Sequence, residues 1–177
     1  MYEKATACWR DLPWRRTVDP YAILVSELML QQTQVVRVVP KYEAWIARFP
    51  DAASLAAAAT EEVLALWSGL GYNRRALALH RAAKAIVADF GGVLPRDEAA
   101  LRTLPGVGAY TSRAVLAFAF DLPSPFLETN IRTVFLKHFF PGGEGVPDSA
   151  LEAVAAATLD RAAPRRWYTA LLDYGAE

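Results

Sequence analysis

Cysteine is almost absent from this sequence, which has one cysteine, Cys8, in 177 residues. A single thiol cannot close a disulfide within the chain, and it cannot supply the thiolates that hold a zinc ion or an iron–sulfur cluster. We therefore expect no iron–sulfur cluster. The neighbours of Cys8 include no catalytic partner, so we interpret it as a small packed side chain.

Long apolar runs are also absent. No run reaches the roughly 20 residues that a membrane-spanning helix requires. Residues 1–20 are polar and contain Pro13 and Pro20, which is unlike a signal peptide. These absences predict a cytoplasmic protein with no membrane partner.

Net charge is lacking as well, because 19 Lys and Arg residues balance 19 Asp and Glu residues. A neutral chain is poorly suited to hold nucleic acid by bulk electrostatics. Binding through backbone amides and a few local bases stays open. Residues 72–84 hold three Arg, one Lys, one His and no acid, and they form either a local basic surface or an ordinary solvated helix face.

The alternation of polar and apolar residues that marks a strand is not sustained anywhere. Instead, apolar segments with helical spacing are separated by proline and glycine, and the 54% hydrophobic content is that of a globular chain. We predict an all-α fold of about ten short helices. Their expected ranges are roughly 2–10, 20–31, 34–48, 61–67, 73–89, 97–103, 109–120, 130–139, 148–160 and 165–174.

Three residues predict where some of these helices begin, kink or end. Thr33 and Thr60 stand where N-caps are expected. Pro40 should kink the third predicted helix or end it early.

One predicted helix is apolar nearly all round. Residues 21–30 read YAILVSELML, with Ser26 and Glu27 as the polar members. Such a helix is expected to be buried, and burial raises the pKa of a carboxyl until it can hold a proton near pH 7. Glu27 is therefore either a reactive carboxyl or a buried glutamate paired with an arginine.

A second motif is the segment LRTLPGVGAYTSRA at 101–114, where a tight turn joins two predicted helices. Gly106 and Gly108 lack side chains, so a flat surface could approach the backbone. The amides that follow Gly106 suit a phosphate, and carbonyls of the turn could face a monovalent cation. An ordinary helix–turn–helix connection with glycine C-caps is the alternative.

At this point the sequence resembles a known family. LPGVG between two helices is similar to the helix-hairpin-helix of the HhH-GPD superfamily of base-excision DNA glycosylases, and FLETNIRTV at 126–134 resembles its catalytic segment. The remaining motifs stand in the order found in MutY-type adenine DNA glycosylases, and the resemblance covers nearly the whole chain. They are LPWR (12–15), DPY (19–21), SELMLQQTQV (26–35), WSGLGYNRRA (67–76) and ALLDYGA (170–176).

The resemblance implies a single HhH-GPD domain over 1–177, with two helical lobes flanking a DNA-binding cleft. One lobe would be 20–125, with the hairpin at about 97–120. The other would join 1–19 to 126–177. Glu27 and Glu128 would face each other across the cleft.

The resemblance also implies roles for the carboxylates. Glu27 would be the general acid that protonates a ring nitrogen of the departing base. Glu128 stands where the family has aspartate, which stabilises or attacks the oxocarbenium-like sugar. Glutamate is longer by about 1.5 Å, so either the backbone compensates or the chemistry changes. Alternatively, Glu128 only caps a helix. Asn130 would hydrogen-bond locally at the same helix start.

Further residues are expected to contact DNA. Gln31 and Gln32 would serve the flipping of the base, and the resemblance gives the role of filling the gap to Gln31, with Tyr72 wedging nearby. Both glutamines could also be ordinary turn residues. The other expected DNA contacts are Arg74, Arg75, Leu104, Gly106, Val107 and Gly108. The expected cation, Na⁺ or K⁺, would lie at the backbone carbonyls of Arg102, Leu104 and Val107.

Tyr110 bears on the reaction type. Lyase relatives such as endonuclease III have a lysine there for Schiff-base chemistry, which tyrosine cannot perform. We expect a monomeric, monofunctional glycosylase acting on double-stranded DNA, most simply on adenine opposite G or 8-oxoguanine. The chain stops at Glu177, without the family's cluster cysteines and 8-oxoguanine-reading domain. A thymine, uracil or damaged-base glycosylase and a non-catalytic DNA-binding module are the alternatives.

Overall fold

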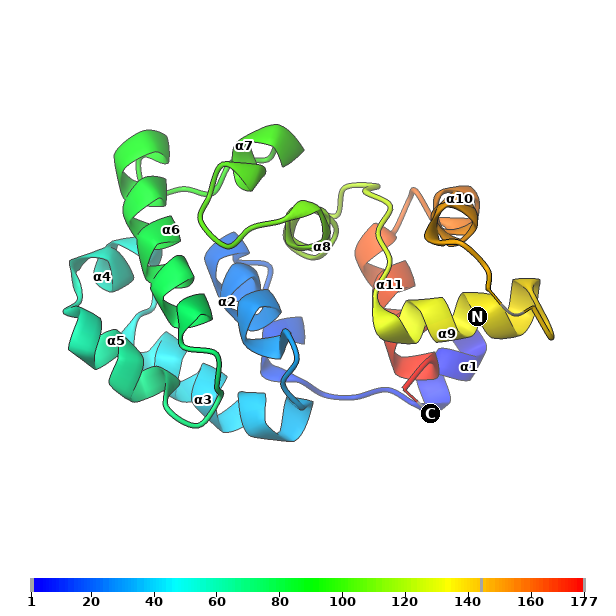
Figure 1. The fold of residues 1–177 in the computed structure, drawn as a ribbon, viewed down its shortest axis with the longest axis horizontal. Coiled ribbons are helices and arrows are strands. Elements are labelled where there is room, and N and C mark those ends of the chain that lie inside the picture. The colour runs from blue at the N-terminus through cyan, green and yellow to red at the C-terminus, as the bar shows by residue number, and fades with distance from the viewer. Residues whose placement is uncertain (1, 144, 177) are drawn as a thin grey trace.

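The computed structural model describes residues 2–143 and 145–176, and every regular element in these ranges is helical (Figure 1). The predicted all-α fold is confirmed. No helix in the described ranges is long and apolar enough to span a membrane. The helices are α1 (Tyr2–Ala7), η1 (Pro13–Arg15), α2 (Pro20–Leu30), α3 (Val35–Arg48), α4 (Ala52–Ala57), α5 (Thr60–Trp67), α6 (Arg74–Phe90), α7 (Glu98–Arg102), α8 (Ala109–Phe120), α9 (Thr129–Phe139), α10 (Asp148–Thr158) and α11 (Pro164–Tyr174).

Helix α2 lies at the centre of the larger group of helices and packs against α3, α6 and α8. It begins at a standard N-terminal signal: the carboxylate of Asp19 accepts a hydrogen bond of 3.0 Å from the amide of Tyr21, and Pro20 occupies the first helical position. Nine of its eleven residues are buried. The burial expected from its apolar composition is therefore confirmed.

Some expected helix boundaries are wrong. Ala52–Ala57 forms the additional helix α4, because Asp51 and Ser54 make a reciprocal capping box at its start. Thr60 is the first residue of α5 rather than its cap, which is Ala59.

The expectation for Thr33 is wrong, and of the two outcomes expected for Pro40 the early end of the helix is wrong. Gln34, not Thr33, is the N-cap of α3, and the hydroxyl of Thr33 instead lies between two loops. Helix α3 continues through Pro40 to Arg48 instead of ending early. Pro40 is exposed, so water can serve the carbonyl that loses its amide partner.

The buried side chains form two hydrophobic cores, and α8 contributes to both. Val115, Leu116 and Ala119 of α8 belong to the first core, together with side chains from α2 to α7. Ala114 and Ala117 belong to the second, together with side chains from α9, α10 and α11. Helix α8 therefore ties the two groups of helices together through opposite faces.

The N-terminal segment connects both cores. Helix α1 packs against α11, whereas η1 contacts α2 and α3. Trp14 of η1 packs against the first core. The chain thus passes from one group of helices to the other between Ala7 and Pro13, earlier than the expected boundary after residue 19.

Candidate active site

A cavity of about 820 Å³ opens where the two groups of helices meet. Its size is that of a typical small-molecule or nucleobase site. Its walls come from η1, α2, α8, α9 and α11, from one residue each of α3 and α10, and from the segments around η1, after α2 and before α9. Six of the residues predicted from the sequence line it: Glu27, Gln31, Gln32, Tyr110, Glu128 and Asn130.

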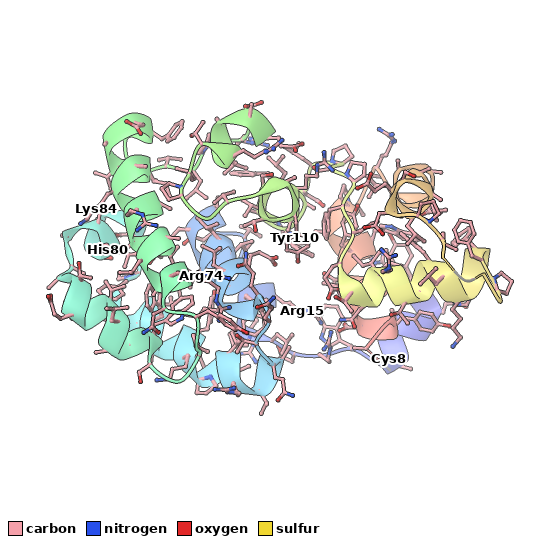
Figure 2. The ribbon with its side chains drawn as sticks, in the orientation of Figure 1. Cys8, Arg15, Arg74, His80, Lys84 and Tyr110 are labelled. Carbon is pink, nitrogen blue, oxygen red and sulfur yellow. The ribbon has the colours of Figure 1, made fainter. Side chains whose placement is uncertain are left out.

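Glu27 projects from α2 into this cavity and is 7% exposed. Tyr110, which projects from α8 (Figure 2), donates a hydrogen bond of 2.9 Å from its phenol to Oε2 of Glu27. Burial raises the pKa of Glu27, the hydrogen bond from Tyr110 opposes this rise, the charge of Glu128 adds to it, and the resulting pKa is about 7. Glu27 therefore exchanges its proton near neutral pH.

Glu128 lines the same cavity and caps α9. Its backbone is extended, and Oε2 accepts a hydrogen bond of 2.8 Å from the amide of Asn130. Burial raises the pKa of Glu128, while the amides of α9 and the charge of Arg10 oppose the rise. The same side chain therefore caps α9 and lines the cavity.

The segment after α2 carries Gln31 and Gln32. The side-chain amide of Gln31 donates to the hydroxyl of Thr111 on α8 at 3.4 Å. Gln32 is exposed and has a φ of +54°, in the left-handed region that side chains other than glycine rarely adopt. Both glutamines line the cavity at its edge, as a pair at the end of a buried helix.

Three residues predicted to contact DNA lie outside the cavity and differ in exposure and in their contacts: Tyr72, Arg74 and Arg75. Tyr72 is 55% exposed with a φ of +48°, and the guanidinium of Arg74 lies 5.8 Å from its ring centroid. Arg74 is exposed at the start of α6 (Figure 2). Arg75 is only 7% exposed, and the two terminal nitrogens of its guanidinium donate hydrogen bonds within the protein.

The hairpin between α7 and α8 holds the predicted phosphate-binding residues. Leu104 and Val107 are buried, and the amide of Val107 donates to the carbonyl of Leu104 at 3.1 Å. Gly106 has a φ of +83°, and a Cβ there would come within 2.8 Å of the Cβ of Ala78. Gly106 is therefore needed for packing against α6, whereas a Cβ on Gly108, the N-cap of α8, would meet open space.

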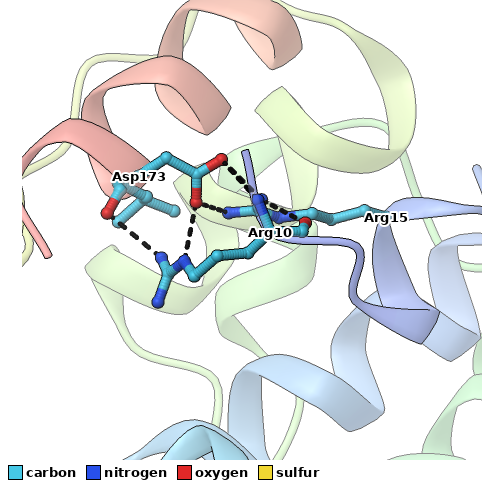
Figure 3. A network of polar contacts seen from close by, with 4 residues as sticks. Arg10, Arg15 and Asp173 are labelled. Carbon is cyan, nitrogen blue, oxygen red and sulfur yellow. Dashed lines mark hydrogen bonds and ion pairs between the residues drawn. The ribbon is translucent and has the colours of Figure 1, made fainter. Parts of the chain in front are cut away.

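Sequence reasoning missed the ion-pair network of Arg10, Arg15 and Asp173 (Figure 3). The fully buried carboxylate of Asp173 accepts from Nε of Arg10 at 2.7 Å and from both terminal nitrogens of Arg15 at 2.7 and 2.8 Å. Both arginines line the cavity. Arg15 lies in the motif LPWR and Asp173 lies in the motif ALLDYGA. These two motifs were the sequence features that could have indicated the network.

The side chains provide no metal centre within the described ranges. Among residues 2–143 and 145–176, no group of three or more His, Cys, Asp and Glu residues is placed to hold a metal ion. A cation at the hairpin would therefore depend on backbone carbonyls.

The described residues combine a helical hairpin with a cavity lined by two carboxyl groups, and comparison with known proteins shows the family to which the chain belongs. The family model described as "HhH-GPD superfamily base excision DNA repair protein" matches residues 25–156. The chain belongs to this superfamily. The resemblance inferred from the motifs is confirmed.

Similar proteins extend this assignment. The chain is 47% identical over 171 residues to the adenine DNA glycosylase of Mycolicibacterium smegmatis, covering 94% of this chain and 58% of that protein. It is 42% identical over 172 residues to the adenine DNA glycosylase of Mycobacterium tuberculosis, covering 94% and 56%. The chain thus spans a little over half the length of these relatives. A solved thermostable thymine-DNA glycosylase superposes with a TM-score of 0.89 at 28% identity, covering 99% of this chain and 84% of that one.

Proposed function

We propose that this chain is a monofunctional DNA glycosylase that flips adenine out of double-stranded DNA, opposite G or 8-oxoguanine, and hydrolyses its N-glycosidic bond. The observation that carries the proposal is the pair Glu27 and Glu128, two carboxyls that line one cavity of about 820 Å³. The identity of 47% to an adenine DNA glycosylase supports adenine as the base.

In this proposal Glu27 acts in its protonated form. It gives its proton to a ring nitrogen of the base, which then takes the electron pair of the breaking bond to C1′ and leaves as a neutral molecule. The pKa of about 7 keeps a large share of Glu27 protonated at neutral pH. The hydrogen bond from Tyr110 holds the carboxyl in place.

Glu128 acts as the anion of the pair. Its negative charge stabilises the oxocarbenium-like sugar, or one of its oxygens bonds to C1′ until water displaces it. Water supplies the new oxygen on C1′ and releases a proton to a carboxylate. Because Glu128 lines the cavity while it caps α9, its carboxylate would be within reach of the sugar.

Exposed groups around the cavity would hold the DNA. Gln31, Gln32 and Tyr72 would occupy the place of the flipped base, and Arg74 would contact phosphate. At the hairpin the buried side chains of Leu104 and Val107 leave the backbone as the binding surface. Unpaired amides at the start of α8, next to Gly108, suit a phosphate.

A monovalent cation fits the same hairpin. The donors would be the carbonyl oxygens of Arg102, Leu104 and Val107, which are neutral and therefore suited to Na⁺ or K⁺. The carbonyl of Leu104 accepts one hydrogen bond, from Val107, and has a second lone pair. When bound, the ion would supply positive charge next to a DNA phosphate.

The proposed lack of lyase activity is supported by the residue at position 110. Tyr110 has no amine and cannot form an imine with the sugar. Borohydride treatment during turnover should therefore trap no covalent complex with DNA, and strand breaks should appear only after alkali. Trapping by the wild-type protein would contradict a monofunctional reaction.

The decisive test is base release under single-turnover conditions. End-labelled duplexes containing A·8-oxoG, A·G, A·C, T·G or U·G would be incubated with the protein and treated with hot alkali. We expect cleavage of A·G or A·8-oxoG that Glu27→Gln and Glu128→Gln both abolish. Release only from T·G or U·G would support the glycosylase reaction but would show that the excised base is a pyrimidine and not adenine. Tight binding without any release would indicate a non-catalytic DNA-binding module.

A further inference from the structure

One arginine joins two loops that stand apart in the sequence. Arg75 lies at the start of α6, and its two terminal nitrogens donate hydrogen bonds to six acceptors. Nη1 donates to the carbonyls of Leu28 at 3.0 Å, Met29 at 3.2 Å and Gln31; Nη2 donates to the hydroxyl of Thr33 at 3.0 Å and to the carbonyls of Leu70 and Gly71, each at 3.2 Å.

These acceptors belong to two segments, which we call the glutamine loop (residues 31–34) and the tyrosine loop (residues 68–73), and to the last turn of α2. The last carbonyls of a helix have no partner inside the helix. Arg75 supplies that partner at the negative end of α2, which favours a positive charge there. Its side chain therefore serves as a buried cap for α2 and as a bridge between the loops.

Each loop contains a residue in a strained conformation. Gln32 has a φ of +54° and Tyr72 a φ of +48°, and Asp121 is the third side-chain-bearing residue with positive φ in the described ranges. Such conformations persist only where the surroundings impose them. The acceptors of Arg75 include groups directly beside both residues, namely Gln31, Thr33 and Gly71.

The hydroxyl of Thr33 lies at the junction. It accepts from Nη2 of Arg75, and it lies 3.2 Å from the carbonyl of Gln31 and 3.4 Å from that of Leu70. The rings of Trp67 and Tyr72 flank the guanidinium, each with its centroid 5.4 Å away. Hydrogen bonds to both loops and contacts with two aromatic rings therefore hold the junction.

We propose that Arg75 is a positioning residue for base flipping, which holds the glutamine loop and the tyrosine loop together as one rigid wedge. This inference rests on the proposed function and deepens it. Gln31 and Tyr72 would then enter the duplex as a unit, with no need to order two separate loops at each encounter. Arg75 itself touches neither base nor phosphate, because its guanidinium is buried.

The planar fork of arginine explains why this residue stands there. Its terminal nitrogens point in different directions and reach both loops at once, whereas the single nitrogen of lysine has three donors at one point. Lysine at position 75 is therefore expected to serve one loop and release the other. The effect of lysine at position 75 therefore distinguishes a positioning role for Arg75 from a role that only balances charge.

The test measures base flipping directly. 2-Aminopurine would replace the target adenine opposite G, and its fluorescence on leaving the stack would be recorded by stopped flow at saturating protein. We expect Arg75→Met and Arg75→Lys to lower the ratio of flipped to stacked base at least about tenfold, as misplaced contacts do. Thr33→Val should lower it in the same direction, and Thr33→Ser should restore it.

Two controls separate positioning from loss of stability. Ile86→Val shortens a fully buried side chain on the same α6, away from both loops, and should leave the flipping ratio at the wild-type value. The second control combines Arg75→Met with Gln31→Ala. Because both changes affect one wedge, their effects on the flipping ratio should be far from additive.

The outcomes distinguish this proposal from the proposed function. If wild type excises its base and Arg75→Met and Thr33→Val flip as well as wild type, the positioning role is overturned while the enzyme activity stands. If Arg75→Met does not fold, Thr33→Val decides, because it removes a single hydroxyl. A wild-type protein that binds duplexes but flips no base overturns both proposals.

Discussion

The phenol of Tyr110 donates a hydrogen bond of 2.9 Å to Oε2 of Glu27 and so joins α8 to α2 at the wall of the cavity. Burial and the nearby charges of Glu27 and Glu128 raise the pKa of Tyr110 well above its ordinary value. The phenol therefore keeps its proton at neutral pH. A permanent donor beside Glu27 favours the ionised carboxylate and limits how far burial can raise its pKa.

Replacing Tyr110 with phenylalanine should therefore raise the pKa of Glu27 above 7. A hydrogen bond contributes roughly 1 kcal/mol, so the shift should be about half to one pH unit. The descending limb of the single-turnover rate should move to higher pH by that amount in Tyr110→Phe. A limb that stays in place, or moves down, would mean that this hydrogen bond does not control the titration of Glu27.

The wild-type rate of base release should have a bell-shaped dependence on pH. Glu27 must be protonated, so the rate should fall as pH rises through about 7, where Glu27 loses its proton. Glu128 must be ionised, and burial raises its pKa, so the acidic limb should lie above the range of an exposed glutamate. The two apparent pKa values belong to the coupled pair. A rate that keeps rising above pH 8 would exclude Glu27 as the acid.

The same burial should make the protein less stable as pH rises. Between the ordinary glutamate pKa of 4.5 and about 7, the folded protein holds a proton on Glu27 that the unfolded chain has released. The free energy of unfolding should therefore fall across this window, by about 3 kcal/mol in total. Glu27→Gln cannot titrate, and its amide oxygen can still accept from Tyr110.

Urea unfolding of wild type and Glu27→Gln at pH 4.5, 6 and 8 checks this directly. The variant should match wild type at pH 4.5 and become progressively more stable than wild type toward pH 8. A constant difference at all three values would mean that Glu27 titrates normally in the folded protein.

The pattern of Arg74 and Arg75 illustrates what sequence could and could not predict. The two residues are adjacent in the same basic run, and sequence reasoning placed both on DNA. Yet Arg74 is exposed and Arg75 is buried. The burial of Arg75 could have been predicted from the sequence. At helical spacing, Arg75 lies on the same apolar face of α6 as Leu79, Ala82 and Ile86.

Other features depend on contacts that no local pattern encodes. The burial of α2 follows from its composition, and so does the unusual position of Glu27. The partner of Glu27 is 83 residues away, however, and the carboxylate of Asp173 meets Arg15 across 158 residues. Such pairs are set by how helices pack, so motif order alone indicated which segments matter and not which atoms meet.

Glu128→Asp tests whether the backbone has adapted to the longer side chain. Aspartate is also a good N-cap, so the variant should retain the start of α9 and its stability. Its carboxylate would be drawn back from the cavity by about 1.5 Å, which should lower the single-turnover rate about 100-fold. A faster rate than wild type would show that the scaffold is still built for aspartate.

Asp173→Asn should destabilise the protein by about 3 kcal/mol, because it leaves the charges of Arg10 and Arg15 beside a buried neutral group. It should also slow base release, since both arginines line the cavity and the charge of Arg10 acts on Glu128. Asp11→Asn is the matched control, as Asp11 pairs with Arg16 on the surface of the same segment. That variant should change stability and rate little, because exposed ion pairs are screened by water. Thermal unfolding and single-turnover assays of both variants would decide, and equal effects would show that the Asp173 network does not hold the N-terminal segment against α11.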